Sequence, residues 1–304
     1  MVHSNGDISM SRIEEALAKA AKLRTQQSVT KDLIAQPHSE PASTSEKNVS
    51  EQQPSTTSPL YPQVDPISLK NETLVSATEP QSPMAEEYRK LKEMLIKLTK
   101  QDQTHNTLMV TSAMVGEGKT TTALNLAISM AQEYDHTVLL IDADLRRPSV
   151  ERYLDLGTRP GLSDCLLDNT SIRDVLVKTG IGKLMILPAG RIVSNPGELF
   201  SSKKMRDLIR EMKHRYADRY IIIDTPPVLP FAETRTMSRI VDGVVMIIKA
   251  GLSSLENIQD AINAMHGANI LGLVYNQATL DTLNSSYAYY YKNYYTAYGY
   301  RNEK

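Results

Sequence analysis

The amino-acid sequence predicts an α/β fold in which a mostly parallel central sheet carries helices on both faces. Six short runs are apolar almost throughout: TLMVT, TVLLID, KLMILP, YIIIDT, GVVMIIK and NILGLVYN. Segments with helical periodicity lie between most of these runs. Strands that are buried on both faces read as continuous apolar runs, whereas strands with one solvated face alternate polar and apolar residues. The pattern therefore favours a parallel sheet between two helical layers.

The composition changes along the chain and divides it into four parts. Residues 1–24 contain SRIEEALAKAAKLR, with a serine and a glutamate in capping-box spacing, and we predict a short helix that either docks on a partner or frays in solvent. Residues 25–83 hold eight of the fifteen prolines and no glycine, which predicts a disordered linker. Residues 84–284 carry the strands and helices of the folded domain, and residues 285–304 form a tail.

Charge, cysteine content and hydropathy exclude several classes of function. The chain has 34 basic and 35 acidic residues and a net charge of −1, so no bulk field draws it to nucleic acid. The single cysteine, Cys165, excludes an internal disulfide and is interpreted as a small buried hydrophobic residue. The sequence contains neither an apolar run of about 18 residues nor a secretory signal. We expect a cytoplasmic protein that reaches a membrane only through a partner.

Two helices of the folded domain can be predicted in detail. One precedes YIIIDT, with Asn195 as its N-cap, Pro196 in its first position and an apolar face of Met205, Leu208, Ile209, Met212 and Tyr216. The other follows GVVMIIK, with an apolar face of Leu255, Ile258, Ile262 and Met265. In such folds ligands bind at the carboxyl ends of the strands.

A candidate phosphate site lies in TLMVTSAMVGEGKTTTALNLAISMA, which reads as strand, loop and helix. Backbone N–H groups of a tight glycine-containing loop converge on phosphate oxygens, and the helix N-terminus adds positive potential. Lys119 would reach the β- and γ-phosphates and Thr120 would ligate Mg²⁺. The strict loop pattern has a glycine where this chain has Ala113. The residues predicted to bind nucleotide here are Gly116, Glu117, Gly118, Lys119 and Thr120.

Three aspartates stand at the ends of predicted strands. Asp142 and Asp144 end the strand in VLLIDADLRRP, and Asp224 ends the strand in YIIIDTPPV. Each alone is typical of any strand that runs into a loop. Together, beside a phosphate-binding loop, they predict a site that holds hydrated Mg²⁺ and orients a nucleophile for phosphoryl transfer.

The three motifs GEGKTT, LLIDADLRRP and IIIDTPP together resemble those of the bacterial tyrosine kinases (BY-kinases) of capsule and exopolysaccharide systems. The resemblance covers roughly residues 84–300 and implies a P-loop NTPase fold with ATP and Mg²⁺ as cofactors. It also implies that Thr121 joins the phosphate site, that Asp142 and Asp224 serve the metal, and that Asp144 binds the metal or activates the tyrosine hydroxyl. Asn276, at the end of the last strand, resembles the position at which related ATPases read adenine.

Two further features carry the resemblance. In EEYRKLK, Glu86, Arg89 and Lys92 share one helical face, which is similar to the family's ring-forming motif with lysine replacing its last arginine. An ordinary solvated charge face is the alternative. The tail resembles the family's autophosphorylation cluster, although a tyrosine-rich tract can also act as an adhesive patch. Its tyrosines are Tyr287, Tyr289, Tyr290, Tyr291, Tyr294, Tyr295, Tyr298 and Tyr300.

The resemblance implies that the chain is an autokinase that phosphorylates its own tail in trans. The implied partners are further copies of the chain, a transmembrane adaptor of the chain-length-regulator type and a phosphotyrosine phosphatase, at the inner face of the cell membrane. Two alternatives stay open. MinD- and ParA-type ATPases are similar in fold, although their loop has a lysine at the position of Met114. A non-catalytic, nucleotide-dependent scaffold is the other alternative.

Overall fold

A computed structural model of the chain describes residues 67, 69, 71–100, 105–133, 136–215 and 219–278. The predicted N-terminal helix (1–24), the predicted linker up to residue 66 and the tyrosine-rich tail (285–304) lie outside the described residues.

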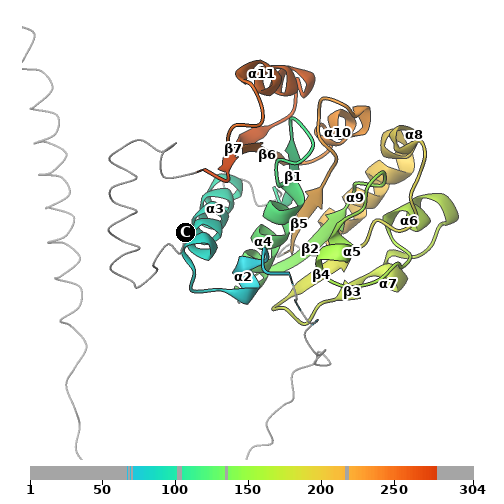
Figure 1. Ribbon diagram of the computed structural model, residues 1–304. Coiled ribbons are helices and arrows are strands. Elements are labelled where there is room, and N and C mark those ends of the chain that lie inside the picture. The colour runs from blue at the N-terminus through green and yellow to red at the C-terminus, as the bar shows by residue number, and fades with distance from the viewer. Residues whose placement is uncertain are drawn as a thin grey trace, which may run out of the picture. The chain divides into compact units, whose positions relative to one another are not determined.

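The described residues form a seven-stranded sheet with the strand order β3-β4-β2-β5-β1-β6-β7 (Figure 1). Neighbouring strands are parallel except β3, which runs antiparallel to β4. The sheet confirms the predicted α/β class, and all six predicted apolar runs are strands; only the two-residue β3 was not predicted. The bounds are β1 Thr107–Ser112, β2 Thr137–Asp142, β3 Val177–Lys178, β4 Leu184–Leu187, β5 Arg219–Asp224, β6 Gly243–Lys249 and β7 Ile270–Asn276.

Helices cover both faces of the sheet. Successive residues of a strand point to opposite faces, and because these strands are apolar almost throughout, both faces are buried. Leu108, Leu140 and Ile222 belong to one buried cluster, and their neighbours Met109, Leu139 and Ile221 belong to the other. The first cluster packs against α2 Val75–Thr78, α3 Pro83–Thr99, α4 Lys119–Ala131 and α5 Val150–Tyr153. The second packs against α6 Leu162–Asp168, α7 Ile172–Val175, α8 Pro196–Ser201, α9 Lys203–Arg215, α10 Ala232–Met237 and α11 Leu255–Ala264. Cys165 is buried in the second cluster, as predicted.

The predicted linker was wrong at its C-terminal end, because the chain is already folded before Pro83. Leu74 is fully buried and Val75 begins α2. Asn125 of α4 holds this segment at both sides: its Oδ1 accepts a hydrogen bond from the Ser76 N–H at 2.9 Å, and its Nδ2 donates to the Thr73 carbonyl at 2.9 Å. The polar composition of residues 25–83 predicted a linker, although Leu74 and Val75 at its C-terminal end are buried beside α4.

The single helix predicted from Pro196 onward is two helices, α8 and α9, because Ser202 adopts an extended backbone with ψ 153°. The Ser202 hydroxyl stabilises the break: it donates to the Leu199 carbonyl at 2.7 Å and accepts from the Met205 N–H at 3.1 Å. Asn195 occupies the N-cap position of α8, but its side chain makes no capping bond and instead donates to Glu198 at 2.8 Å. In α11, the predicted apolar face was wrong at Leu255, which is 81% exposed.

Candidate active site

The phosphate-binding loop connects β1 to α4 and has the backbone that its glycines allow. Gly116 and Gly118 have φ values of 87° and 88°, in the left-handed region that other residues rarely adopt. A Cβ atom on Gly118 would also lie 2.2 Å from Nδ2 of Asn276. The positive φ therefore favours glycine at position 118, and a larger residue there would also displace the side chain of Asn276. Lys119 and Thr120 open the first turn of α4 behind it.

Glu117 stabilises this loop through hydrogen bonds of its side chain and its carbonyl. Its side chain is fully buried, and its carboxylate accepts hydrogen bonds from the Met114 N–H at 2.8 Å, the Ser253 hydroxyl at 2.7 Å and the Lys249 N–H at 3.3 Å. The Glu117 carbonyl accepts from Nδ2 of Asn276 at 2.8 Å. The predicted nucleotide-binding residue Glu117 thus uses its carboxylate to join the loop to the end of β6, and Asn276 joins the same loop to the end of β7.

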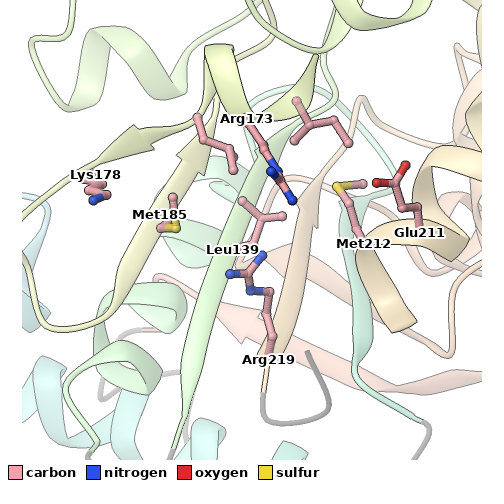
Figure 2. A pocket seen from close by; sticks show the side chains of 9 residues that line it. Leu139, Arg173, Lys178, Met185, Glu211, Met212 and Arg219 are labelled. Atoms are coloured by element: carbon pink, nitrogen blue, oxygen red, sulfur yellow. The ribbon is translucent and has the colours of Figure 1, made fainter. Parts of the chain in front are cut away.

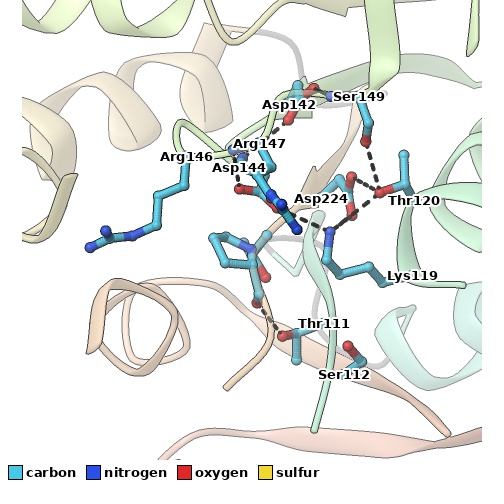
Figure 3. A network of polar contacts seen from close by, with 12 residues as sticks. Thr111, Ser112, Lys119, Thr120, Asp142, Asp144, Arg146, Arg147, Ser149 and Asp224 are labelled. Atoms are coloured by element: carbon cyan, nitrogen blue, oxygen red, sulfur yellow. Dashed lines mark hydrogen bonds and ion pairs between the residues drawn. The ribbon is translucent and has the colours of Figure 1, made fainter. Parts of the chain in front are cut away.

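Two of the three predicted aspartates, Asp144 and Asp224, lie beside Lys119 (Figure 3). The strand register places Asp142 directly beside Asp224 on the neighbouring strand. The Lys119 ammonium lies 3.3 Å from Oδ2 of Asp144 and 3.9 Å from Oδ1 of Asp224. Thr120 donates its hydroxyl to Oδ2 of Asp224 at 2.6 Å. Lys119, Thr120 and the three aspartates thus meet at the carboxyl ends of the strands.

The loop after β2 holds the two aspartates of that strand in different environments. Asp142 is fully buried and accepts from the N–H groups of Ser149, Val150 and Asp144 at 3.0, 3.0 and 3.1 Å. Asp144 accepts from the Arg147 N–H at 3.0 Å, and its side chain is 9% exposed. Among the three aspartates of the site, Asp144 is the one that solvent, or a substrate, reaches.

Burial dominates the electrostatics of the site. Burial, and then the charge of Asp224, raise the pKa of Asp142 to about 7, although its backbone hydrogen bonds oppose the shift. Burial also raises the pKa of Asp224, against the opposing effects of Lys119 and Thr120. Burial acts to lower the pKa of Lys119, but the charges of Asp224 and Asp144 outweigh it, and the pKa is raised. The lysine therefore stays protonated, while the charges and hydrogen bonds around Asp142 and Asp224 do not offset the cost of burying their carboxylates.

This arrangement fits a divalent cation that arrives with phosphate ligands. Oδ1 of Asp224 is buried and, within the part of the chain that the structure describes, accepts no hydrogen bond. Thr120 and Asp224 could hold the ion, with Asp142 behind them. No three His, Cys, Asp or Glu side chains among the described residues form a metal site by themselves. Mg²⁺ is commonly bound by one or two carboxylates together with substrate phosphates and water.

Several contacts near the site were not predicted from the sequence. The Ser149 hydroxyl donates to the Thr120 hydroxyl at 3.3 Å. The Thr121 hydroxyl, which was expected at the phosphates, lies 3.0 Å from the Tyr153 hydroxyl. The buried carboxylate of Glu233 pairs with Arg146 at 2.5 Å. None of these contacts has a local sequence signal, because each joins residues from different elements.

The predicted charge face of α3 is only partly exposed. Glu86 and Arg89 form a surface ion pair at 2.6 Å, and Arg89 also donates to the Pro80 carbonyl at 2.7 Å. Lys92 instead is 9% exposed and pairs with Glu133 at the end of α4, at 2.5 Å. The alternative of an ordinary solvated charge face is therefore wrong for Lys92, and the ring-forming role of the three residues stays a prediction. The tail tyrosines, Tyr287 to Tyr300, lie outside the described residues.

A cavity lies away from this site, between α7, α9 and strands β2 to β5 (Figure 2). Its volume is about 250 Å³, and its walls combine apolar side chains with a few charged ones. It includes none of the loop residues or aspartates described above. Its lining residues are Leu139, Ile172, Arg173, Leu176, Lys178, Met185, Glu211, Met212 and Arg219.

Comparisons with known proteins define the class of this domain. A family model described as an AAA domain matches residues 106–270, which contain the phosphate-binding loop and all three aspartates. Together with the sheet and the loop geometry, this match establishes a P-loop NTPase fold and confirms the predicted fold class. Among the described residues, no helix is both long and apolar enough to cross a membrane.

Individual relatives identify the family. Tyrosine-protein kinase YwqD of Bacillus subtilis (strain 168) is 36% identical over 219 residues, which are 71% of this chain and 90% of the relative. The chimerical protein CapA2B2 has a TM-score of 0.63 at 28% identity, over 69% of this chain and 91% of that one. The kinase domain of Escherichia coli tyrosine kinase ETK has a TM-score of 0.62 at 28% identity, over 68% and 82%. The chain belongs to the bacterial tyrosine kinase family and is a protein-tyrosine kinase, as predicted.

Proposed function

We propose that this kinase transfers the γ-phosphoryl group of ATP to tyrosines in the C-terminal tail of neighbouring copies, and thereby regulates the synthesis and export of exopolysaccharide or capsule. The observation that carries this proposal is the convergence of Lys119, Asp144 and Asp224 beside the phosphate-binding loop. The same chain provides eight acceptor tyrosines between Tyr287 and Tyr300.

The residues of the site divide the work of phosphoryl transfer. Backbone N–H groups of the glycine loop and the Lys119 ammonium bind the phosphates. Asp144, at the rim, accepts the phenolic proton as the tyrosine oxygen forms its bond to the γ-phosphorus. The bond from that phosphorus to the β–γ bridging oxygen breaks, and ADP leaves. A carboxylate that reaches solvent suits this proton transfer, whereas fully buried Asp142 and Asp224 do not meet the substrate.

The buried acids serve the metal. Thr120 and Asp224 would hold Mg²⁺, and Asp142 would act partly through water. When bound, Mg²⁺ supplies the positive charge that neutralises phosphate oxygens during transfer. It also offsets the repulsion between the carboxyl groups, which explains why acids with raised pKa values are retained there. Asn276 stands beside the loop, where it would contact the adenine side of the nucleotide.

Delivery of the tail from a neighbouring copy requires little intrinsic affinity. Because β1, β6 and β7 are parallel, β7 ends at the same side of the sheet as the phosphate loop, and the tail comes later in the sequence. Within an oligomer the local concentration of tails is on the order of millimolar. Each phosphotyrosine adds a charge of about −1.5 to −2 at pH 7, so several on one tail repel one another and loosen the assembly. Glu86 and Arg89, which are partly exposed on α3, would contact a second copy.

Two partners complete the proposed cycle. A transmembrane adaptor of the chain-length-regulator type would hold the kinase at the inner face of the cell membrane and activate it. A phosphotyrosine phosphatase would reset the tail. The resemblance of the three nucleotide motifs to kinases of capsule and exopolysaccharide systems supports both partners. Nucleic acid has no part in the cycle, in keeping with the net charge of −1.

Purified full-length chain with Mg-ATP tests the proposal, with phosphotyrosine and ADP measured in parallel. We expect phosphotyrosine in the wild-type chain and none in Lys119→Met. A variant with all eight tail tyrosines replaced by phenylalanine should keep nucleotide binding and lose most phosphotyrosine. ATP hydrolysis without phosphotyrosine would favour a MinD-like switch instead. Nucleotide binding without turnover, with and without an adaptor segment, would favour a scaffold.

A further inference from the structure

We propose that Arg147 is an additional catalytic residue that contacts the γ-phosphoryl oxygens as the phosphoryl group transfers. The inference rests on the proposed function, because it concerns the same site and the same reaction. It arises from the contrast between two consecutive arginines in the loop after β2.

Arg146 is committed to a structural role. Its guanidinium pairs with the buried carboxylate of Glu233 at 2.5 Å and lies 4.8 Å from the centre of the Phe231 ring. Figure 3 shows its side chain extending away from the aspartates. A guanidinium whose charge is balanced by a buried carboxylate and packed on an aromatic ring is not available to a phosphate.

Arg147 is placed differently. Its N–H donates to Oδ1 of Asp144 at 3.0 Å, which fixes the start of the side chain at the rim of the site. The side chain itself is exposed, and among the described residues its guanidinium makes neither a hydrogen bond nor an ion pair. In Figure 3 it extends toward Lys119, on the side opposite to Arg146.

The site carries more negative than positive charge once a triphosphate is bound, so a further cation would stabilise it. The Lys119 ammonium already lies 3.3 and 3.9 Å from the carboxylates of Asp144 and Asp224, and a triphosphate adds further negative charge. During transfer, the tyrosine oxygen bonds to the γ-phosphorus as the bridging oxygen departs and Asp144 takes the phenolic proton. Negative charge is then spread over three equatorial oxygens. The planar guanidinium of Arg147 can donate two parallel hydrogen bonds to such oxygens, which one lysine ammonium cannot do.

The test compares Arg147→Gln and Arg147→Lys with a matched control, Arg152→Gln, which removes another exposed arginine five positions further along. Single-turnover formation of phosphotyrosine is measured in the full chain at saturating Mg-ATP. Affinity is measured for Mg-ADP alone and for Mg-ADP with aluminium fluoride, a mimic of the transferring phosphoryl group. We expect Arg147→Gln to slow transfer about 100-fold and to lose the tightening by aluminium fluoride, with ADP affinity unchanged within about twofold. Arg147→Lys should restore part of the rate, and Arg152→Gln should match the wild type.

Three results would overturn the role of Arg147. They are a transfer rate for Arg147→Gln within about threefold of the wild type, an intact aluminium fluoride effect, or a rate loss that parallels an equal loss of ADP affinity. The last result would indicate a structural or ground-state role. Failure of the proposed function is distinguishable, because wild-type chain would then form no phosphotyrosine at all. The aluminium fluoride measurement would still decide whether Arg147 contacts the transferring group during hydrolysis.

Discussion

Replacing Asp224 by asparagine should stabilise the nucleotide-free protein while it weakens Mg²⁺-dependent nucleotide binding. Asp224 is fully buried, and its pKa is raised by burial even though Lys119 and Thr120 both favour its charged form. Because burial outweighs these partners, the charged form of Asp224 lowers the free energy of unfolding. The asparagine keeps an acceptor for the Thr120 hydroxyl and removes the charge.

The magnitude follows from the pKa of the neighbouring acid. Asp142 shifts from 3.8 to about 7, and one pKa unit corresponds to about 1.4 kcal/mol, so the full shift limits the effect to about 4 kcal/mol. The charge of Asp224 is the second of the two causes that raise this pKa, and Asp224→Asn removes it. We therefore expect the free energy of unfolding to increase by about 2 kcal/mol at pH 8. For a domain of this size, that gain corresponds to an increase in Tm of about 4–8 °C.

The gain should depend on pH in a defined direction. Folded Asp142 keeps a proton that the unfolded chain releases, so the free energy of unfolding of the wild type falls as pH rises from about 4 to about 7. The advantage of Asp224→Asn is therefore small at pH 5 and full at pH 8. Calorimetry of the nucleotide-free chain in EDTA at both pH values measures this difference. The control is Asp207→Asn, which removes a partly exposed carboxylate that pairs with Arg210 on the surface. A lower Tm for Asp224→Asn at pH 8, or the same difference at both pH values, would refute the reasoning.

The remaining predictions concern packing, the loop anchor and the α3 ion pair. Leu74→Ala should lower the free energy of unfolding by about 2–5 kcal/mol in urea titrations. The control, Met84→Ala, changes an exposed side chain and should alter that free energy by less than about 0.5 kcal/mol. Equal effects of the two substitutions would mean that α2 is not part of the core. Glu117→Gln places an amide against the backbone N–H of Met114, so it should weaken ADP binding at least about tenfold while the chain stays folded. A fluorescence titration measures the affinity. An unchanged affinity would contradict the role of Glu117 in holding the phosphate loop. Glu133→Ala leaves the buried charge of Lys92 without its partner, so it should lower Tm more than Lys92→Met does. A larger decrease in Tm for Lys92→Met would indicate that the lysine is exposed to solvent.

The sequence was most informative where each residue acts through its own segment. Continuous apolar runs predicted six of the seven strands, and the glycine loop and the aspartates Asp142 and Asp224 were placed correctly because parallel strands end at one edge. Local composition failed where a distant contact decides the structure. Leu74 is ordered by α4 across about fifty residues, and Lys92 is drawn inward by Glu133.

The direction of individual side chains was the least predictable feature of the site. Glu117 stands in the middle of a phosphate-binding motif, yet its carboxylate is buried by contacts to Ser253 and Lys249, which lie more than 130 residues away. Arg146 and Arg147 are identical in type and adjacent in sequence, yet Glu233 and Phe231 give Arg146 an environment that Arg147 does not share. Such distinctions depend on tertiary neighbours, which periodicity and motif spacing do not contain.

A mixing experiment tests the central claim, transfer to the tail of another copy, most directly. Chain with all eight tail tyrosines changed to phenylalanine serves as donor, and Lys119→Met with an intact tail serves as acceptor. After incubation with Mg-ATP, phosphosites are mapped by mass spectrometry. The account predicts phosphotyrosine between Tyr287 and Tyr300 of the Lys119→Met chain in the mixture, and none at these positions when that chain is incubated alone. An unmodified tail in the mixture, while wild-type chain alone labels its own tail, would contradict transfer between copies.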